Sequence, residues 1–106
     1  MEPCLRTVDC RLYTTGELPK GIYVYTMVRS EQGCLTPIGS STQVQAYHEK
    51  NSVYIYWDAC NKSYRYLLFR SDNFKNRLKQ YVEINTEDGL FIDDGTRKFI
   101  DYDGNK

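Results

Sequence analysis

Residues 51–71, NSVYIYWDACNKSYRYLLFRS, most constrain what this chain can fold into. Two runs rich in aromatic and β-branched residues flank a short polar stretch, which is the pattern of two β-strands joined by a turn. In the first run Val53, Ile55 and Trp57 share one face, because successive side chains of a strand point to opposite sides. The segment also holds the only tryptophan of the chain. The sequence therefore predicts a β-rich core built around these residues.

Size and charge restrict the function classes. A chain of 106 residues supports one domain with one core. Fourteen basic and fourteen acidic residues cancel, so the charge excess that phosphate backbones attract is missing and nucleic-acid binding is disfavoured. Lys75, Arg77 and Lys79 form a small basic cluster, which we interpret as a solvated face because acidic residues flank it.

The cysteines and the apolar runs bear on the cellular setting. The first residues lack the apolar run of a signal peptide, and no stretch approaches the ~20 apolar residues that span a membrane. We therefore expect a protein made in the cytoplasm, not exported by a signal peptide and not bound to a membrane. No CxxC pair occurs, which favours reduced thiols over zinc ligands, and pairing of Cys4 with Cys10 stays open. The four cysteines are Cys4, Cys10, Cys34 and Cys60.

Short β-type runs recur along the chain with turn signals every 8–12 residues, which is typical of a β-sandwich. Residues 1–20 are expected to form an N-terminal arm or an edge strand, and residues 103–106 a polar tail. Between them, residues 21–102 form the predicted sandwich. Phe74, Leu78 and Tyr81 recur at helical spacing, so one short helix near 72–80 is expected, with a long loop as the alternative. The expected strands are 5–14, 21–30, 34–46, the two runs within 51–71, 81–85, 90–93 and 98–102.

Four stretches resemble fibronectin type III domains. Residues 53–57 (VYIYW) and 66–71 (YLLFRS) are similar to the B and C strands. Residues 91–95 (FIDDG) resemble the F-x-D-x-G that closes the same half in bacterial and phage examples. Residues 21–28 (GIYVYTMV), followed by the turn at Gly33, resemble the F strand and the F–G turn.

The order of these stretches is permuted, since the F–G pair precedes the B–C pair. That order resembles fibronectin-like units in virion proteins of tailed bacteriophages, over about residues 21–96. The resemblance implies an all-β, fibronectin type III or Ig-like sandwich. It also implies a non-enzymatic virion structural protein, an auxiliary capsid, neck or tail component. Its partners would be other virion proteins, such as the major capsid, portal, neck or tail proteins, and it would be present in several copies.

The strand faces predict a core and an interface. The predicted core consists of Tyr23, Tyr25, Val53, Ile55, Trp57, Tyr66, Leu68 and Phe91. In a fibronectin sandwich F and C are neighbours, so their outward side chains would form an apolar patch, and such patches mark protein interfaces. The predicted subunit contact consists of Ile22, Val24, Val28, Leu67 and Phe69. The alternative is that residues 1–20 or 72–80 cover this face internally.

No catalytic, cofactor or metal site is predicted. The acidic residues Glu87, Asp88, Asp93 and Asp94 could suggest calcium, yet a full ligand loop is absent and turn chemistry explains them. His48 beside Glu49 has no positioned nucleophile and is interpreted as an exposed turn residue. Cys60 is interpreted as an incidental thiol.

Tyrosine-rich strands leave other binding functions open. Aromatic rings can stack on sugars, so a carbohydrate- or receptor-binding module is the main alternative to a virion structural protein. An accessory domain of a secreted bacterial enzyme is a third possibility, disfavoured by the absence of a signal sequence.

Overall fold

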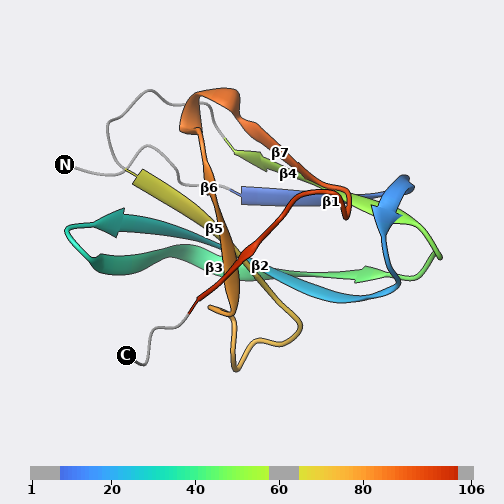
Figure 1. Cartoon of the computed structure of the whole chain (residues 1–106), viewed down its shortest axis with the longest axis horizontal. Coiled ribbons are helices and arrows are strands. Elements are labelled where there is room, and N and C mark those ends of the chain that lie inside the picture. Colours follow the sequence, from blue (N-terminus) through green and yellow to red (C-terminus); the bar gives the residue numbers. More distant parts are fainter. Residues whose placement is uncertain (1–7, 58–64, 103–106) are drawn as a thin grey trace.

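The computed structural model describes residues 8–57 and 65–102 as two antiparallel sheets packed face to face (Figure 1). One sheet has the order β1-β4-β7 and the other the order β3-β2-β5-β6-β8. The predicted all-β Ig-like sandwich is confirmed. The strands are β1 (Val8–Leu18), β2 (Gly21–Glu31), β3 (Cys34–Ala46), β4 (Asn51–Trp57), β5 (Arg65–Ser71), β6 (Gln80–Ile84), β7 (Leu90–Asp93) and β8 (Ile100–Asp101).

The β2–β3 hairpin closes on the shortest possible turn. Glu31 and Cys34 are paired, and Gln32 and Gly33 between them have φ angles of 50° and 83°. Two consecutive positive φ angles give a turn whose twist matches that of the flanking strands. This turn therefore fixes the register of the hairpin.

The two strands of the 51–71 segment lie in different sheets. β4 pairs with β1 and β7, whereas β5 pairs with β2 and β6. The strands predicted as F and C, β2 and β5, are neighbours with Met27 opposite Leu68. β3, β2 and β5 are adjacent in one sheet, and they face the sheet that contains β4. This is the arrangement of an Ig-like sandwich.

The expected helix near residues 72–80 is wrong. Asn73 accepts a hydrogen bond from the backbone N–H of Asn76 at 2.7 Å, so a single turn forms and no helix follows. Leu78 instead packs onto the outer face of the five-stranded sheet. The described residues hold one three-residue 3-10 turn, Thr86–Asp88, and no helix among them is long and apolar enough to cross a membrane.

The N-terminal strand belongs to the sandwich. β1 is an edge strand of the three-stranded sheet, which is one of the two expected forms, and Leu18 is 2% exposed in the core. β1 runs over Val8–Leu18, later than the expected 5–14, and β8 is shorter than the expected 98–102. Residues 1–7 and 103–106 lie outside the described part of the chain.

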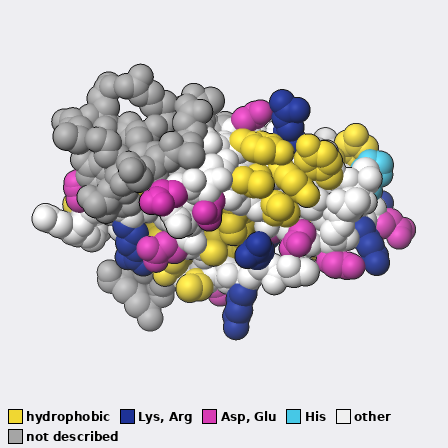
Figure 2. All heavy atoms as spheres, turned by 90° about the horizontal axis from the view of Figure 1, so that it is seen from above, with side chains coloured by type: hydrophobic (Ala, Val, Ile, Leu, Met, Phe, Trp, Pro, Cys, Tyr) yellow, Lys and Arg dark blue, Asp and Glu magenta, His cyan; other side chains and the backbone are white. Residues whose placement is uncertain are grey.

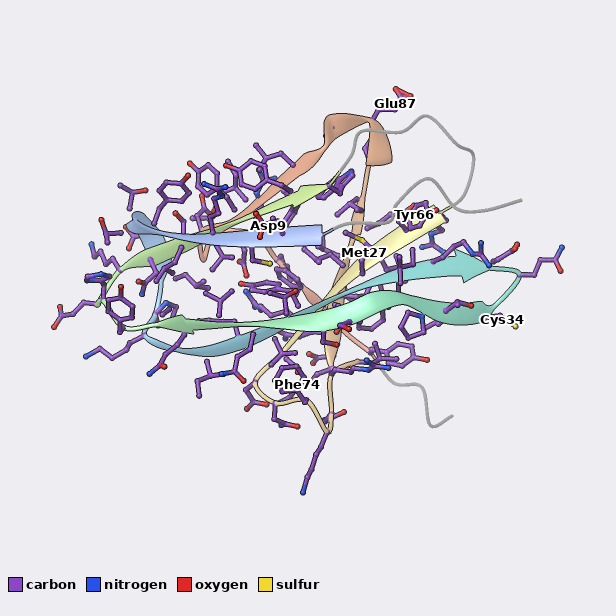
Figure 3. The ribbon with its side chains drawn as sticks, turned by 180° about the vertical axis from the view of Figure 1, so that it is seen from behind. Asp9, Met27, Cys34, Tyr66, Phe74 and Glu87 are labelled. Carbon is purple, nitrogen blue, oxygen red and sulfur yellow. The ribbon has the colours of Figure 1, made fainter. Side chains whose placement is uncertain are left out.

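The main core lies between the two sheets and includes Met27 and Tyr66, which are labelled in Figure 3. Six of the eight predicted core residues are nearly or fully buried there, and the other two, Tyr23 and Phe91, pack against them partly buried. The six are Tyr25, Val53, Ile55, Trp57, Tyr66 and Leu68.

A second, smaller core lies on the outer face of the five-stranded sheet. Val28, Leu67 and Phe69 are buried there beneath side chains from the 72–79 loop and from the last described residue. The ring of Phe69 lies 5.4 Å from that of Tyr81 and 5.3 Å from that of Tyr102. The five-stranded sheet is thus covered on both faces.

The predicted subunit contact is wrong in its location. Val24, Val28 and Phe69 are 0% exposed and Leu67 is 5% exposed within the chain itself, so they form no surface patch. Leu78 helps to cover this side, in agreement with the alternative that residues 72–80 cover it internally, and Tyr102 adds to the cover from outside that range. Ile22 alone remains exposed, at 44%.

Candidate functional site

A partly exposed apolar surface lies on the outer face of the three-stranded sheet, whereas the sequence predicted it on the other sheet. Because Val53, Ile55 and Trp57 point into the core, the alternate residues of β4 point outward. Figure 2 shows this side of the molecule, with a continuous group of hydrophobic side chains over the sheet. We call this surface the tyrosine face, and it consists of Asp9, Arg11, Tyr13, Tyr54, Tyr56, Leu90 and Ile92.

The register arranges the tyrosine face in two rows across β1, β4 and β7. In the first row Asp9 pairs with Tyr56, and Tyr56 pairs with Leu90. The second row has the same order, in which a charged residue on β1 is followed by a tyrosine on β4 and an aliphatic residue on β7. It consists of Arg11, Tyr54 and Ile92.

The tyrosine rings lie along the sheet and contact one another. The ring centroids of Tyr13 and Tyr54 are 4.5 Å apart with 54° between planes, and those of Tyr54 and Tyr56 are 6.3 Å apart with 38°. Tyr13 sits opposite Ser52 yet shares a hydrogen bond with Tyr56, so its side chain reaches along the strand over Tyr54. This hydrogen bond raises the pKa of Tyr56. The three rings therefore form one contiguous aromatic surface over the sheet.

The charges of the tyrosine face cancel. Nε of Arg11 lies 3.7 Å from the carboxylate of Asp9, and both side chains are more than half exposed. An exposed pair of this kind adds little stability, about 0–1 kcal/mol. Within residues 8–57 and 65–102 no group of three His, Cys, Asp or Glu residues could hold a metal ion. What the face offers is aromatic and aliphatic contact area with a few hydroxyl groups.

A buried polar cluster joins the two sheets. Nη1 of Arg70 donates to both carboxylate oxygens of Asp93, at 2.9 and 2.8 Å, and the Tyr25 hydroxyl donates to the same carboxylate at 2.7 Å. Gln80 accepts from Nε and Nη2 of Arg70, whose guanidinium lies 4.0 Å from the centroid of the Phe99 ring. Burial, and then the Asp93 carboxylate, raise the pKa of Tyr25. The cluster is internally satisfied.

The interpretation of Asp93 as a turn residue is wrong. It is 0% exposed and lies opposite Val53 in the ladder, so its side chain points into the core. The signal was available in the sequence, because the alternation of β7 places Asp93 on the same face as Phe91. Asp94 does follow turn chemistry, since its carboxylate accepts from the Thr96 backbone N–H at 3.0 Å, and these bonds lower its pKa.

A cavity of about 180 Å³ adjoins the polar cluster. Both of its cationic side chains are already paired, Arg70 with Asp93 and Lys79 with Asp72 at 3.7 Å. We therefore assign it no ligand. The cavity is lined by Ile22, Tyr23, Arg70, Ser71, Asp72, Lys79 and Gln80.

The other residues noted in the sequence do not converge on a site. His48 is exposed and its ring lies 4.5 Å from that of Tyr47. Cys10 is a half-buried free thiol facing the core, and Cys34 is an exposed free thiol at the tip of the β2–β3 hairpin (Figure 3). Glu87 is exposed on the 3-10 turn. Cys4 and Cys60 lie outside the described residues.

Comparisons with protein-family models, with curated proteins and with solved structures find no match for this chain. The binding surface of this protein must therefore be inferred from the geometry of the described residues, and the tyrosine face is the best candidate for it.

Proposed function

We propose that this chain is a non-enzymatic structural protein of a tailed-phage virion, an auxiliary capsid, neck or tail component. It binds and stabilises neighbouring virion subunits, and its contact surface is the tyrosine face. The resemblance of residues 21–96 to fibronectin-like units of virion proteins supports the setting. The observation that carries the binding role is that apolar side chains gather, partly exposed, on the outer face of the three-stranded sheet, whereas a second core covers part of the other sheet.

The composition of the tyrosine face suits a protein contact. Tyrosine buries a large ring while its hydroxyl stays hydrogen-bonded, and it fixes few rotatable bonds on binding. Protein interfaces are enriched in tyrosine and depleted of charged residues at their centres. Tyr54 and Tyr56 lie at the centre of this face, and its one ion pair lies at the β1 edge. Burial of such a face would stabilise a complex by about 25 cal/mol per Å² of apolar surface, before the cost of association.

Carbohydrate binding is a second candidate, because three tyrosine rings lie together on this sheet. A sugar stacks on an aromatic face, and several sugars in a chain would need rings in a common plane. The planes of Tyr13 and Tyr54 differ by 54° and those of Tyr54 and Tyr56 by 38°. The tilted packing of ring on ring favours the irregular surface of a protein.

The test is a binding assay against the proteins encoded beside the gene for this chain. Purified coat, neck and tail proteins, and the chain itself, are immobilised, and binding of the full chain is measured by biolayer interferometry. Tyr56→Arg, at the centre of the tyrosine face, should abolish binding to one of them. The matched control Tyr47→Arg changes a tyrosine that is 64% exposed and lies off the face, and it should bind as the native chain does.

Two results would contradict the proposal. One is equal binding by the native chain and the Tyr56→Arg variant, because the contact would then lie elsewhere. The other is that no virion protein binds while a glycan array shows retention that Tyr56→Arg removes. That outcome would establish the carbohydrate-binding alternative.

A further inference from the structure

We infer that the partner of the tyrosine face is a second copy of this chain, stacked face to face about a two-fold axis. This inference rests on the proposed role of the face as a protein contact and names the partner. It follows from the pattern of the two rows of side chains and from their charges.

The pattern is complementary to itself. A two-fold axis that lies in the contact plane, perpendicular to the strands and midway between the rows, turns each sheet over and reverses its strands. β1 then lies over β1 of the other copy, and the first row lies over the second row. Asp9 therefore faces Arg11 of the other copy, while the tyrosines of β4 face each other and Leu90 faces Ile92. Charge meets opposite charge, aromatic meets aromatic and aliphatic meets aliphatic.

The symmetry doubles each contact. In a two-fold interface, a residue that faces a partner residue is faced by the same residue in return. The Asp9–Arg11 pair within one chain is thus joined by two pairs between chains, with no charge left opposite a like charge. Stacked sheets usually cross at about 30°. The long side chains of arginine and tyrosine can span the resulting displacement of the outer positions.

The size of the face sets the expected strength. Three strands about 4.8 Å apart make a narrow surface. It is smaller than the ~800 Å² that each partner buries in an interface of standard size. We expect a dissociation constant between about 10 μM and 1 mM, which high local concentration in a particle would saturate.

The experiment is sedimentation equilibrium of the full chain from about 10 μM to about 1 mM, with three charge variants. Asp9→Arg and Arg11→Asp each place like charges opposite one another twice in the dimer, so each should weaken dimerisation by about tenfold or more. The double variant Asp9→Arg/Arg11→Asp restores opposite charges at both contacts and should dimerise like the native chain. Thermal unfolding checks that all variants are folded.

A matched charge reversal on the other sheet provides the control. Glu83 pairs with Arg65 at 3.1 Å and is 55% exposed, so Glu83→Arg breaks an ion pair of similar exposure far from the face and should leave the dimer intact. A native chain that stays monomeric up to about 1 mM would overturn the inference. A dimer that the double variant fails to restore would also overturn it, because the two rows would not then face one another.

The two proposals fail separately. If the chain is monomeric while Tyr56→Arg abolishes binding to a different virion protein, this inference fails and the proposed function stands. If the charge variants behave as expected but the chain binds none of the coat, neck and tail proteins, the dimer stands and the proposed role in the virion fails.

Discussion

The Asp93 carboxylate on β7 lies 2.8 Å from Nη1 of Arg70 on β5, so an ion pair links the two sheets across the core. Asp93 is fully buried and the Arg70 side chain is 18% exposed. Two charges in such a setting are tolerable only while both are present and hydrogen-bonded. The pair therefore favours one relative position of the two sheets.

We predict that Asp93→Ala lowers the free energy of unfolding by about 3–5 kcal/mol, because it leaves a largely buried guanidinium without its counter-ion. Urea denaturation followed by tryptophan fluorescence measures this change. Asp72→Ala is the control. It removes the exposed Asp72–Lys79 pair, at 3.7 Å, and should cost at most about 0.5 kcal/mol.

The double variant Asp93→Leu/Arg70→Met tests the same account. It replaces both charges by apolar groups and should lose less stability than the single variants predict by addition. If the loss of stability in the double variant equals the sum of the losses in the single variants, the broken ion pair is not the cause of the single-variant losses.

Alkaline pH should destabilise the fold through Cys10. Burial, and then the neighbouring Asp9, raise the pKa of the Cys10 thiol to about 12, whereas an unfolded thiol titrates near about 8.5. Below about pH 8.5 the thiol is protonated in both states and its contribution to stability is complete. Above that pH the unfolded chain loses the proton first, and stability falls by up to about 1.4 kcal/mol per pH unit until the folded thiol also titrates.

Urea denaturation at pH 7.5, 9 and 10 measures this slope. Cys10→Ala should flatten it, while Cys34→Ala, at an exposed thiol, should leave it unchanged. Equal slopes in the native chain and the Cys10→Ala variant would refute the assignment.

Gly95 should resist replacement because of both its backbone and its neighbours. Its φ of +88° is in the left-handed region, and a Cβ there would lie 2.6–2.7 Å from backbone atoms of Glu17 and Leu18. We expect Gly95→Ala to cost about 3 kcal/mol or more. Gly33 has a similar φ of +83° with nothing within 4 Å, so Gly33→Ala isolates the backbone strain at about 1 kcal/mol. Melting temperatures that fall equally would contradict this difference.

The second core should behave as a core rather than as an interface. Phe69→Ala removes a ring that is 0% exposed and should cost about 3–5 kcal/mol. Phe74 is 51% exposed on the 72–79 loop, so Phe74→Ala should change stability by less than about 0.5 kcal/mol. Chemical denaturation measures both changes. A Phe69→Ala variant as stable as the native chain would mean that Tyr81 and Tyr102 do not bury the ring.

Local patterns of the sequence predicted most of the strands and the main core, because alternation along β4 is a property of the strand itself. Val53, Ile55 and Trp57 face inward by that rule alone. The local pattern does not predict which outer face of the sandwich stays uncovered. That depends on where the 72–79 loop and Tyr102 come to rest, which is decided by contacts far apart in the sequence.

The residues that make up the candidate site were present in the sequence but were not assigned to it. Alternation along β4 puts Tyr54 and Tyr56 on the face opposite Val53, Ile55 and Trp57, yet their neighbours on β1 and β7 cannot be identified without the register. The helix near residues 72–80 failed for a related reason. Leu78 and Tyr81 are apolar because they pack, partly buried, against the second core, whereas Phe74 is 51% exposed.

The coverage of the five-stranded sheet on both faces bears on how this protein can change over evolutionary time. Strands β2 and β5 have few positions free of packing constraints, so most substitutions there carry a stability cost. From Val53 to Trp57, β4 is constrained chiefly at alternate positions. New binding specificities are therefore expected to arise by drift at the outward positions of β4 and its two neighbours, while β2 and β5 change slowly.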